Sequence, residues 1–206
     1  MAEDHMTQDE TTAQLLDMVA AEAAFEGWTM KALAAALTQM GHSPIEATVF
    51  FQEPGEMIEG WFRLADDRLV ERLRGSWMET GLSRRVKAAL LARFELWAGE
   101  KEATRRALAH LLLPSQAARL ARVVAHMADS VWYAAEDHSA DFSWYTKRAM
   151  LGGIILAALL YWLADQSNDD EKFSAFLDRR LAGVGRVTKL RKGLSAKLAR
   201  FAPRAA

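Results

Sequence analysis

The side chains of this chain that are best suited to chemistry are its histidines and carboxylates. None of the histidines belongs to an H-E-x-x-H pair for zinc or to an E-x-x-H pair of the kind that di-iron helical bundles use. No G-x-S-x-G nucleophile turn is present either. The five histidines stand singly along the sequence, at His5, His42, His110, His126 and His138. Isolated histidines of this kind are expected to be structural or solvated, so no metal site is predicted.

The remaining candidates for catalysis are equally weak. The carboxylate pair Asp66–Asp67 lies in a stretch of mixed charge and is expected on the solvated face of a helix. The chain contains no cysteine, which excludes disulfides, thiolate metal sites and a cysteine nucleophile. The glycines of "GVGRVT" (residues 183–188) lack the third glycine of a dinucleotide fingerprint. We therefore predict a protein that is not an enzyme and needs no cofactor.

The elements that would position any site are predicted to be helices. Only four prolines interrupt the chain, and the period-2 alternation of apolar residues that marks strands is nearly absent. Thr29 is a candidate N-cap, Gly41 a helix stop, and Ser43 followed by Pro44 a second helix start. The expected helices cover residues 12–25, 30–39, 45–51, 57–73, 84–97, 101–112, 116–135, 142–164, 170–181 and 184–201. The fold class is all-α.

Residues 149–164, "AMLGGIILAALLYWLA", form the most apolar segment and carry no charge. The segment is shorter than the roughly 20 apolar residues that a membrane span needs. Its small residues would allow another helix to approach closely. We expect a central core or dimer helix, with a helix that lines an apolar cavity as the alternative.

Charge is distributed unevenly, although the net charge is only −1. Residues 7–64 contain nine acidic residues, and their basic residues are Lys31 and Arg63. After Asp178 the pattern is reversed, with nine basic residues and no acid. The N-terminal part is therefore expected to repel polyanions and the C-terminal part to attract them.

The C-terminal segment has the pattern of a basic amphipathic helix. Apolar residues recur every three or four positions between residues 184 and 201, and basic residues fill the other faces. Such a helix can lie in an anionic membrane interface, or it can pack its apolar stripe on the domain. Membrane contact is favoured, with the expected contacts at Val187, Lys189, Leu190, Arg191, Lys192, Leu194, Lys197, Leu198 and Phe201.

Residues 25–62 resemble the DNA-binding end of TetR-type repressors. The likeness rests on the entry "FEGWT", the Ala-rich second helix, the glycine turn and the aromatic pair that ends the third helix. The would-be recognition helix "PIEATVFFQE" has no basic residue and carries Glu46 and Glu53. Because DNA binding depends on Lys and Arg near the phosphates, this helix-turn-helix is expected to be structural. A TetR-type ligand-responsive regulator remains the alternative function.

A second resemblance covers most of the chain, from Leu15 to about Leu181. The segment "DSVWYAAEDHSADFSWYTKRAM" (residues 129–150), together with "HLLLP" (residues 110–114) and "GWT", is similar to the ubiquinone (coenzyme Q) biosynthesis protein nine family. That family is a group of lipid-binding accessory proteins. The resemblance implies a TetR-like homodimer that does not bind nucleic acid, and a pocket for an isoprenoid or other lipid. Expected pocket residues are Met150, Leu151, Ile154, Ile155, Ala158, Leu159 and Trp162.

The resemblance also implies a protein partner, the di-iron demethoxyubiquinone hydroxylase. The hydroxylase would bind to a patch formed by Trp132, Asp141, Trp144, Tyr145 and Arg148. Adjacent residues on a helix point about 100° apart, so one apolar stripe cannot easily bury both rings of a Trp-Tyr pair. We expect Trp144 to be displayed for the partner, and the alternative is that both rings lie in the core.

Four segments are predicted on these grounds. They are a disordered N-terminus (1–10), a helix-turn-helix-like segment (11–60), a lipid-binding and dimerisation domain (61–182) and a membrane-contacting basic helix and tail (183–206). The start "MAEDHMTQDETT" has neither a signal peptide nor a transit-peptide pattern. The expected location is the bacterial cytoplasm, peripherally on the inner membrane, or the matrix side of that membrane in a mitochondrion.

Overall fold

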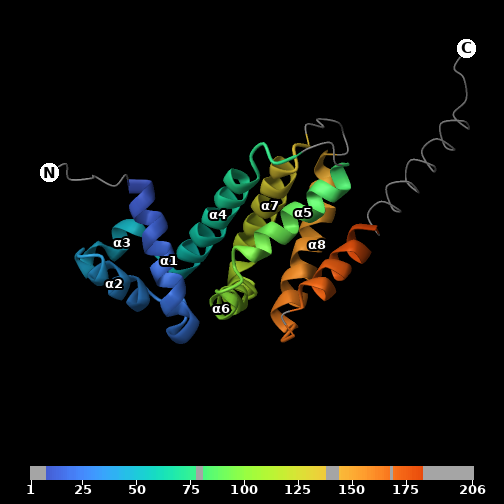
Figure 1. The fold of residues 1–206 in the computed structure, drawn as a ribbon. Coiled ribbons are helices and arrows are strands. Elements are labelled where there is room, and N and C mark those ends of the chain that lie inside the picture. The colour runs from blue at the N-terminus through green and yellow to red at the C-terminus, as the bar shows by residue number, and fades with distance from the viewer. Residues whose placement is uncertain (1–7, 78–80, 138–143, 168, 183–206) are drawn as a thin grey trace, which may run out of the picture.

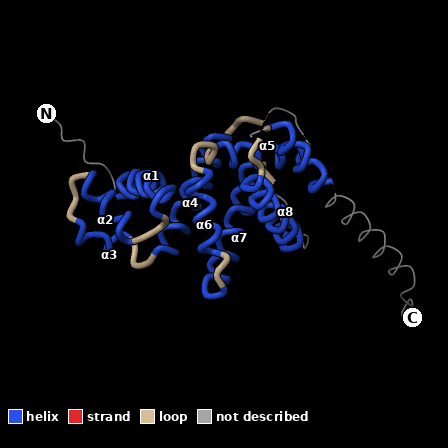
Figure 2. Tube along the Cα trace, turned by 90° about the horizontal axis from the view of Figure 1, so that it is seen from below, coloured by secondary structure: helices blue, strands red, loops and turns tan. Residues whose placement is uncertain are grey.

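The computed structural model describes residues 8–77, 81–137, 144–167 and 169–182, and for Trp144, Tyr145 and Lys147 it describes the backbone. These residues form helices and connecting turns, with no strand among them (Figures 1 and 2). A further helical stretch covers residues 170–182. The elements are α1 (Gln8–Glu26), α2 (Met30–Gln39), η1 (Pro44–Glu46), α3 (Ala47–Phe50), α4 (Pro54–Leu73), α5 (Leu82–Glu95), α6 (Lys101–Leu111), η2 (Pro114–Gln116), α7 (Ala117–Ala134) and α8 (Trp144–Ala164).

The helix-turn-helix end forms where local capping signals predict it. The Thr29 hydroxyl accepts a hydrogen bond from the backbone N–H of Ala32, so α2 begins as expected. Gly41 follows α2 with φ of +80°, a conformation that glycine adopts without steric cost. Ser43 and Glu46 then form a reciprocal capping box that opens the next segment. We predicted a single helix over residues 45–51. The structure divides this segment into the short 3-10 helix η1 and the helix α3.

The start of α4 differs from the prediction. The sequence "EPGE" was expected to break the chain before a helix at Met57, but α4 begins at Pro54. Proline at the first helical position lacks only an N–H that has no partner there, and its φ suits the helix. The carboxylate of Glu56 accepts a hydrogen bond from the backbone N–H of Gln52 at 2.6 Å, which strengthens this start. The predicted domain boundary between residues 60 and 61 therefore falls inside helix α4.

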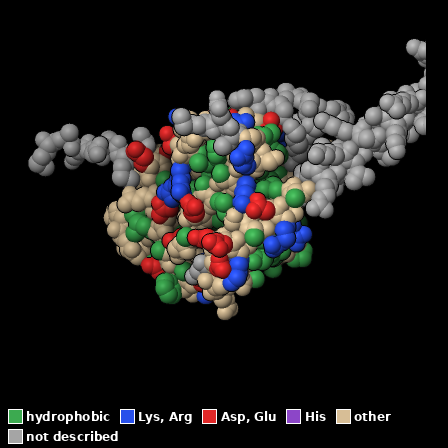
Figure 3. Space-filling model, turned by 45° about the vertical axis from the view of Figure 1, so that its right-hand side comes forward, with side chains coloured by type: hydrophobic (Ala, Val, Ile, Leu, Met, Phe, Trp, Pro, Cys, Tyr) green, Lys and Arg blue, Asp and Glu red, His purple; other side chains and the backbone are tan. Residues whose placement is uncertain are grey.

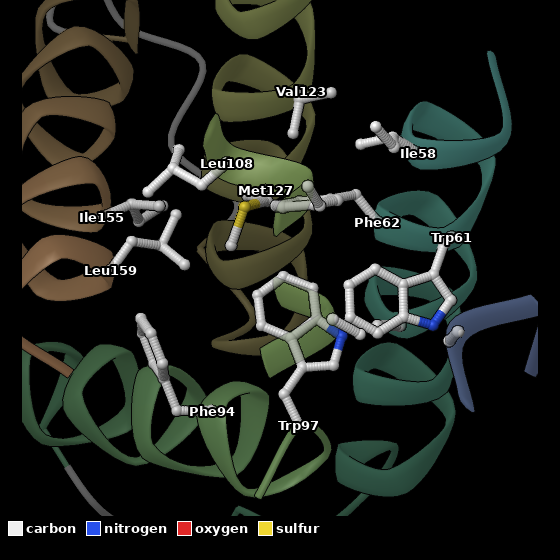
Figure 4. Close-up of a cluster of buried hydrophobic side chains, with 14 of the residues drawn as sticks. Ile58, Trp61, Phe62, Phe94, Trp97, Leu108, Val123, Met127, Ile155 and Leu159 are labelled. Atoms are coloured by element: carbon white, nitrogen blue, oxygen red, sulfur yellow. The ribbon is translucent and has the colours of Figure 1, made fainter. Parts of the chain in front are cut away.

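One hydrophobic core extends through the described chain, from Leu15 in α1 to Leu177 near the C-terminal end. Helix α4 packs along α7, and α7 packs against α8 on its other side. The centre is aromatic: the rings of Trp61 and Trp97 stack with centroids 5.1 Å apart, and Phe62 meets Trp97 edge-on (Figure 4). Trp28 joins this cluster and donates its indole N–H to the carbonyl of Ala103.

Helix α8 contains the apolar segment and packs against α7 and α6. Ile155 and Leu159 point from α8 into the core beside Leu108 (Figure 4). None of the helices within the described ranges is both long enough and apolar enough to cross a membrane. The prediction of a core helix is confirmed for the face of α8 that carries Ile155 and Leu159. The predicted helix over residues 184–201 lies outside the described residues.

The carboxylate of Asp66 is buried, and the prediction that it belongs to a solvated face was wrong. Only 1% of its side chain is exposed, and it accepts a 2.6 Å hydrogen bond from Nε of Arg93 on α5. Arg93 also donates to the carbonyl of Phe62 and lies 3.7 Å above the ring of Trp97. Burial lowers the pKa of Arg93, while Asp66 beside it opposes that shift. The neighbouring Asp67 is exposed, as expected.

A third group reaches this buried pair from the surface. Nδ1 of His126 on α7 lies 2.9 Å from the other carboxylate oxygen of Asp66. The hydrogen bond to Asp66 raises the pKa of His126, although partial burial works against the rise. Asp66 therefore joins α4 to both α5 and α7.

We predict that Asp66→Ala destabilises the fold by about 3–5 kcal/mol, because it leaves the Arg93 charge buried without its partner. Urea denaturation followed by circular dichroism measures the loss. Asp67→Ala is the matched control, since it removes the adjacent exposed carboxylate, and it should change the free energy of unfolding by less than about 0.5 kcal/mol. Equal effects of the two substitutions would contradict a buried ion pair.

We also predict a pH-dependent role for His126. A pKa raised in the folded state means that the His126–Asp66 contact stabilises the fold fully below the ordinary histidine value of 6.5 and less as pH rises through the folded pKa. The loss of stability caused by His126→Gln should therefore be larger at about pH 5.5 than at about pH 8.5. Denaturant titrations of both proteins at the two pH values measure it. A loss independent of pH would show that the imidazolium contributes nothing.

Candidate functional site

Residues 129–150, the segment that resembles the coenzyme Q protein family, begin on α7. They include a Trp-Tyr pair whose two rings lie in different environments. Trp132 is half-buried and packs against the core, whereas 72% of Tyr133 is exposed. This is the arrangement expected when adjacent helical residues point about 100° apart. Tyr133 was not among the predicted site residues, although the same reasoning that was applied to Trp144 and Tyr145 would have selected it.

The second half of the segment lies on α8, next to α7. Nε of Arg148 forms an ion pair with the carboxylate of Asp129 on α7, which connects the two helices. The structure thus brings Trp132 and Arg148, two predicted patch residues, onto neighbouring helices. Asp141 lies outside the described residues, as do the side chains of Trp144 and Tyr145, so the patch itself stays a prediction.

A groove runs between α4 and α7 beside these residues. It consists of adjoining cavities of 290, 560 and 410 Å³. His126 and Asp129 line the first two cavities, and Tyr133 lines the second and third. Arg148 lines the second. Of the predicted patch residues, Arg148 borders this surface depression, which the sequence did not indicate.

Ion pairs connect α7 to α4 and to its N-cap, at the groove and beside it. Nε and Nη2 of Arg122 each donate a 3.2 Å hydrogen bond to one carboxylate oxygen of Glu59. This contact lowers the pKa of Glu59. Arg119 pairs with Glu53 and lies against Gly55, where a side chain would collide with its guanidinium group. Charges of both signs are therefore interspersed along this side of α4 and α7.

No group of three or more metal-ligating side chains occurs within the described ranges. Three of the five histidines lie within the described residues. His42 lies 3.3 Å from Glu46, His126 contacts Asp66, and His110 is half-buried in the last turn of α6. His5 and His138 are outside the described residues.

Most of the predicted lipid-pocket residues are packed in the core. Five of the seven are buried. Ile154 is 7% exposed, and the other four are 2% exposed or less: Leu151, Ile155, Ala158 and Leu159. Met150 is half-buried at the start of α8. Their assignment as pocket walls stays a prediction.

Trp162, the seventh candidate, does border a hollow. A crevice of 340 Å³ lies between α5, α8 and the helical residues 170–182. Apolar side chains form much of its wall, among them Phe94, Trp162 and Phe173. The predicted membrane-contact residues, from Val187 to Phe201, are outside the described residues.

Comparison with known proteins finds the same family that residues 129–150 resemble. Residues 117–188 match the family model COQ9. The chain is 28% identical over 187 residues to the ubiquinone biosynthesis protein COQ9, mitochondrial, of Rattus norvegicus, covering 87% of this chain and 60% of that protein. The corresponding figures for the Homo sapiens protein of the same name are 27%, 87% and 59%. This chain spans less than two thirds of the length of either relative.

Among solved structures, the TetR transcriptional regulator from Nitrosomonas europaea ATCC 19718 superposes with a TM-score of 0.67. Sequence identity is 20%, and the match covers 84% of this chain and 96% of the regulator. At this identity the likeness establishes the fold, and it confirms the predicted TetR-like helical architecture. The chain thus has a TetR-like all-α fold and is similar in sequence to the COQ9 proteins of ubiquinone biosynthesis.

Proposed function

We propose that this protein acts in ubiquinone biosynthesis as a non-catalytic, lipid-binding accessory protein. It presents a polyprenylated quinone intermediate, at a membrane, to the demethoxyubiquinone hydroxylase. The observation that carries the proposal is the match of residues 117–188 to the COQ9 family, since this stretch contains α7, α8 and all five residues of the predicted patch. The names of these relatives indicate the pathway.

Lipid binding is supported by the character of α8 and its surroundings. Residues 149–164 carry no charge, and the crevice at Trp162 is lined by several aromatic side chains. Ligand sites in helical proteins form between helices, and they are mostly apolar with a few polar groups. These features suit an isoprenoid chain.

The outward side of α8 supports association of two copies. Ala149, Gly153, Leu160 and Ala164 are exposed on this helix, and none is charged. On the face seen in Figure 3, hydrophobic side chains are interspersed with charged ones. Exposed uncharged residues along one helix can form an interface, and two-fold homodimers are the commonest assemblies of soluble proteins.

The hydroxylase would be bound by the patch and the adjoining groove. The Asp129–Arg148 pair fixes α7 against α8, and Tyr133 on α7 adds an exposed aromatic side chain. Aromatic and arginine side chains are enriched among the residues that dominate binding energy at interfaces. The tail after residue 182 would engage the anionic surface of the inner membrane, since it carries a net positive charge and an apolar stripe.

A ligand-responsive regulator is the second candidate, because the solved structure that shares the fold is named as a TetR transcriptional regulator. The surface of the would-be recognition helix argues against it. Ile45 and Val49 are 84% and 77% exposed there, and Glu46 and Glu53 are the charged residues of that segment. Such a surface lacks the cations that draw a protein to phosphates.

Replacing Trp144 tests the partner assignment. Trp144→Lys should raise the Kd for the demethoxyubiquinone hydroxylase at least about 30-fold, because a desolvated aromatic anchor becomes a charge. Isothermal titration calorimetry measures the affinity, and thermal denaturation shows that the variant is folded. Phe25→Lys, at an 81% exposed aromatic residue on α1, is the matched control and should bind normally. Unchanged affinity of Trp144→Lys would remove this residue from the interface.

The tail can be tested with liposomes that contain phosphatidylcholine and phosphatidylglycerol. Deleting the residues after Leu181 should abolish most binding. Replacing Lys189, Arg191 and Lys192 with glutamine should weaken it about a hundredfold at low salt, because each basic residue contributes about 1 kcal/mol near an anionic surface. Co-sedimentation at two salt concentrations measures both effects. Binding that survives the deletion would assign membrane contact to another part of the protein.

A further inference from the structure

The most exposed large apolar side chain of the described residues belongs to the helix-turn-helix. Ile45 on η1 is 84% exposed, and Val49 on α3 is 77% exposed. Residues four positions apart on a helix lie on the same face, and Thr48 beside them is also exposed. Ala47 is buried, so the other face of this segment packs on the domain. Ile45, Thr48 and Val49 therefore form an uncharged outward surface, the α3 face.

Acidic residues are in excess at this end of the molecule. Residues 8–53, which contain α1 to α3, include seven acidic residues and a single lysine or arginine, Lys31. Arginines of α4 and α7 pair with two of the carboxylates, Asp17 and Glu53. Glu46, next to the α3 face, is 44% exposed, and the basic group near it is a histidine, which is charged only when protonated. A partner with both basic and apolar side chains would complement this surface.

The chain itself contains a segment of that kind. Residues 183–206, which lie outside the described ranges, include seven basic residues and no acid. Apolar residues recur every three or four positions between 184 and 201, among them Val187, Leu190 and Leu194. An apolar stripe flanked by lysines and arginines matches an apolar surface flanked by carboxylates, in both charge and hydrophobicity.

Geometry favours a contact between two copies over a contact within one. Figure 1 places α1 to α3 at one end and residue 182 at the other, with α4, α7 and α8 between them. Packed helices lie about 8–10 Å apart, so the separation is on the order of 40 Å. A helix rises about 1.5 Å per residue, so residues 183–206 in helical form would span about 36 Å. Most of their basic residues would then fall short of the α3 face of their own chain.

We propose that the α3 face of one copy binds residues 183–206 of a second copy. Opposite charges would bring the two together, and the apolar stripe of the segment would cover Ile45 and Val49. Such a contact is head-to-tail, because it joins different surfaces of the two copies, and it generates rings or open chains. It needs neither a lipid nor the hydroxylase, so it goes beyond the proposed function.

Sedimentation velocity of the full chain without lipid tests the contact. At about 20 mM salt, the average sedimentation coefficient should rise with protein concentration, because charges then attract over a distance on the order of 20 Å. At about 0.5 M salt, screening should weaken this self-association at least about tenfold. A sedimentation coefficient that stays constant with concentration at low salt would overturn the proposal.

The α3 face is tested by Ile45→Lys combined with Val49→Lys. This variant presents like charge to the basic segment and should weaken self-association at least about tenfold. Both residues are exposed, so the fold should persist, and denaturant titration checks this. Phe25→Lys, the same change at an 81% exposed apolar residue on α1, is the matched control and should associate within about twofold of the wild type. Equal association of all three proteins would remove the α3 face from the contact.

A mixture of two variants separates a contact between copies from a contact within one. Replacing Lys189, Arg191 and Lys192 with glutamine weakens the segment and leaves the α3 face intact, whereas Ile45→Lys with Val49→Lys does the reverse. Each variant alone should associate weakly at low salt. In an equal mixture association should return, because one variant supplies the segment and the other supplies the α3 face. A mixture that sediments as the sum of its two parts would overturn the contact between copies.

Discussion

The buried guanidinium of Arg93 constrains how the central helices can pack. A charge without solvent contact is tolerated only where other groups replace its hydration. Asp66, the carbonyl of Phe62 and the face of Trp97 supply those contacts. Asp66 and Phe62 belong to α4, and Trp97 lies in the turn that follows α5. Neither helix can therefore slide or rotate without exposing the charge to apolar surroundings. His126 extends the constraint to α7, and α7 in turn positions α8. The surfaces proposed for the partner and for the lipid both depend on this arrangement.

Much of the secondary structure could be read from the sequence because its signals are local. The Thr29 cap and the Gly41 turn define α2 within a few residues of chain, so its predicted and observed limits coincide. The burial of Asp66 could not be read in this way. Its partner Arg93 is 27 residues away, and neither residue is distinguished from a surface charge until α4 and α5 pack together. The start of α4 was placed too late because Pro54 was treated as a break, although a proline can equally begin a helix.

The candidate site was predictable to a lesser extent. The lack of charged residues identified 149–164 as the most apolar segment, but composition could not separate residues that fill the core from residues that border a hollow. Ile155 and Leu159 fill the core, whereas Trp162, one turn away, borders the crevice. What decides between them is the position of α5 and residues 170–182, which depends on ring contacts such as Phe94–Phe173. The groove between α4 and α7 was missed for the same reason, since it results from two helices that are distant in sequence.

The uneven distribution of charge has a consequence for orientation. Helices α1 to α3, which carry most of the acidic residues of the N-terminal part, lie at one end of the described molecule, and residue 182 lies at the other (Figures 1 and 2). In the sequence, the residues after 182 include seven basic residues and no acid. A negatively charged surface that attracts such a sequence would repel the acidic end of the described molecule. The helix-turn-helix that a repressor directs toward DNA would then turn away from a polyanion.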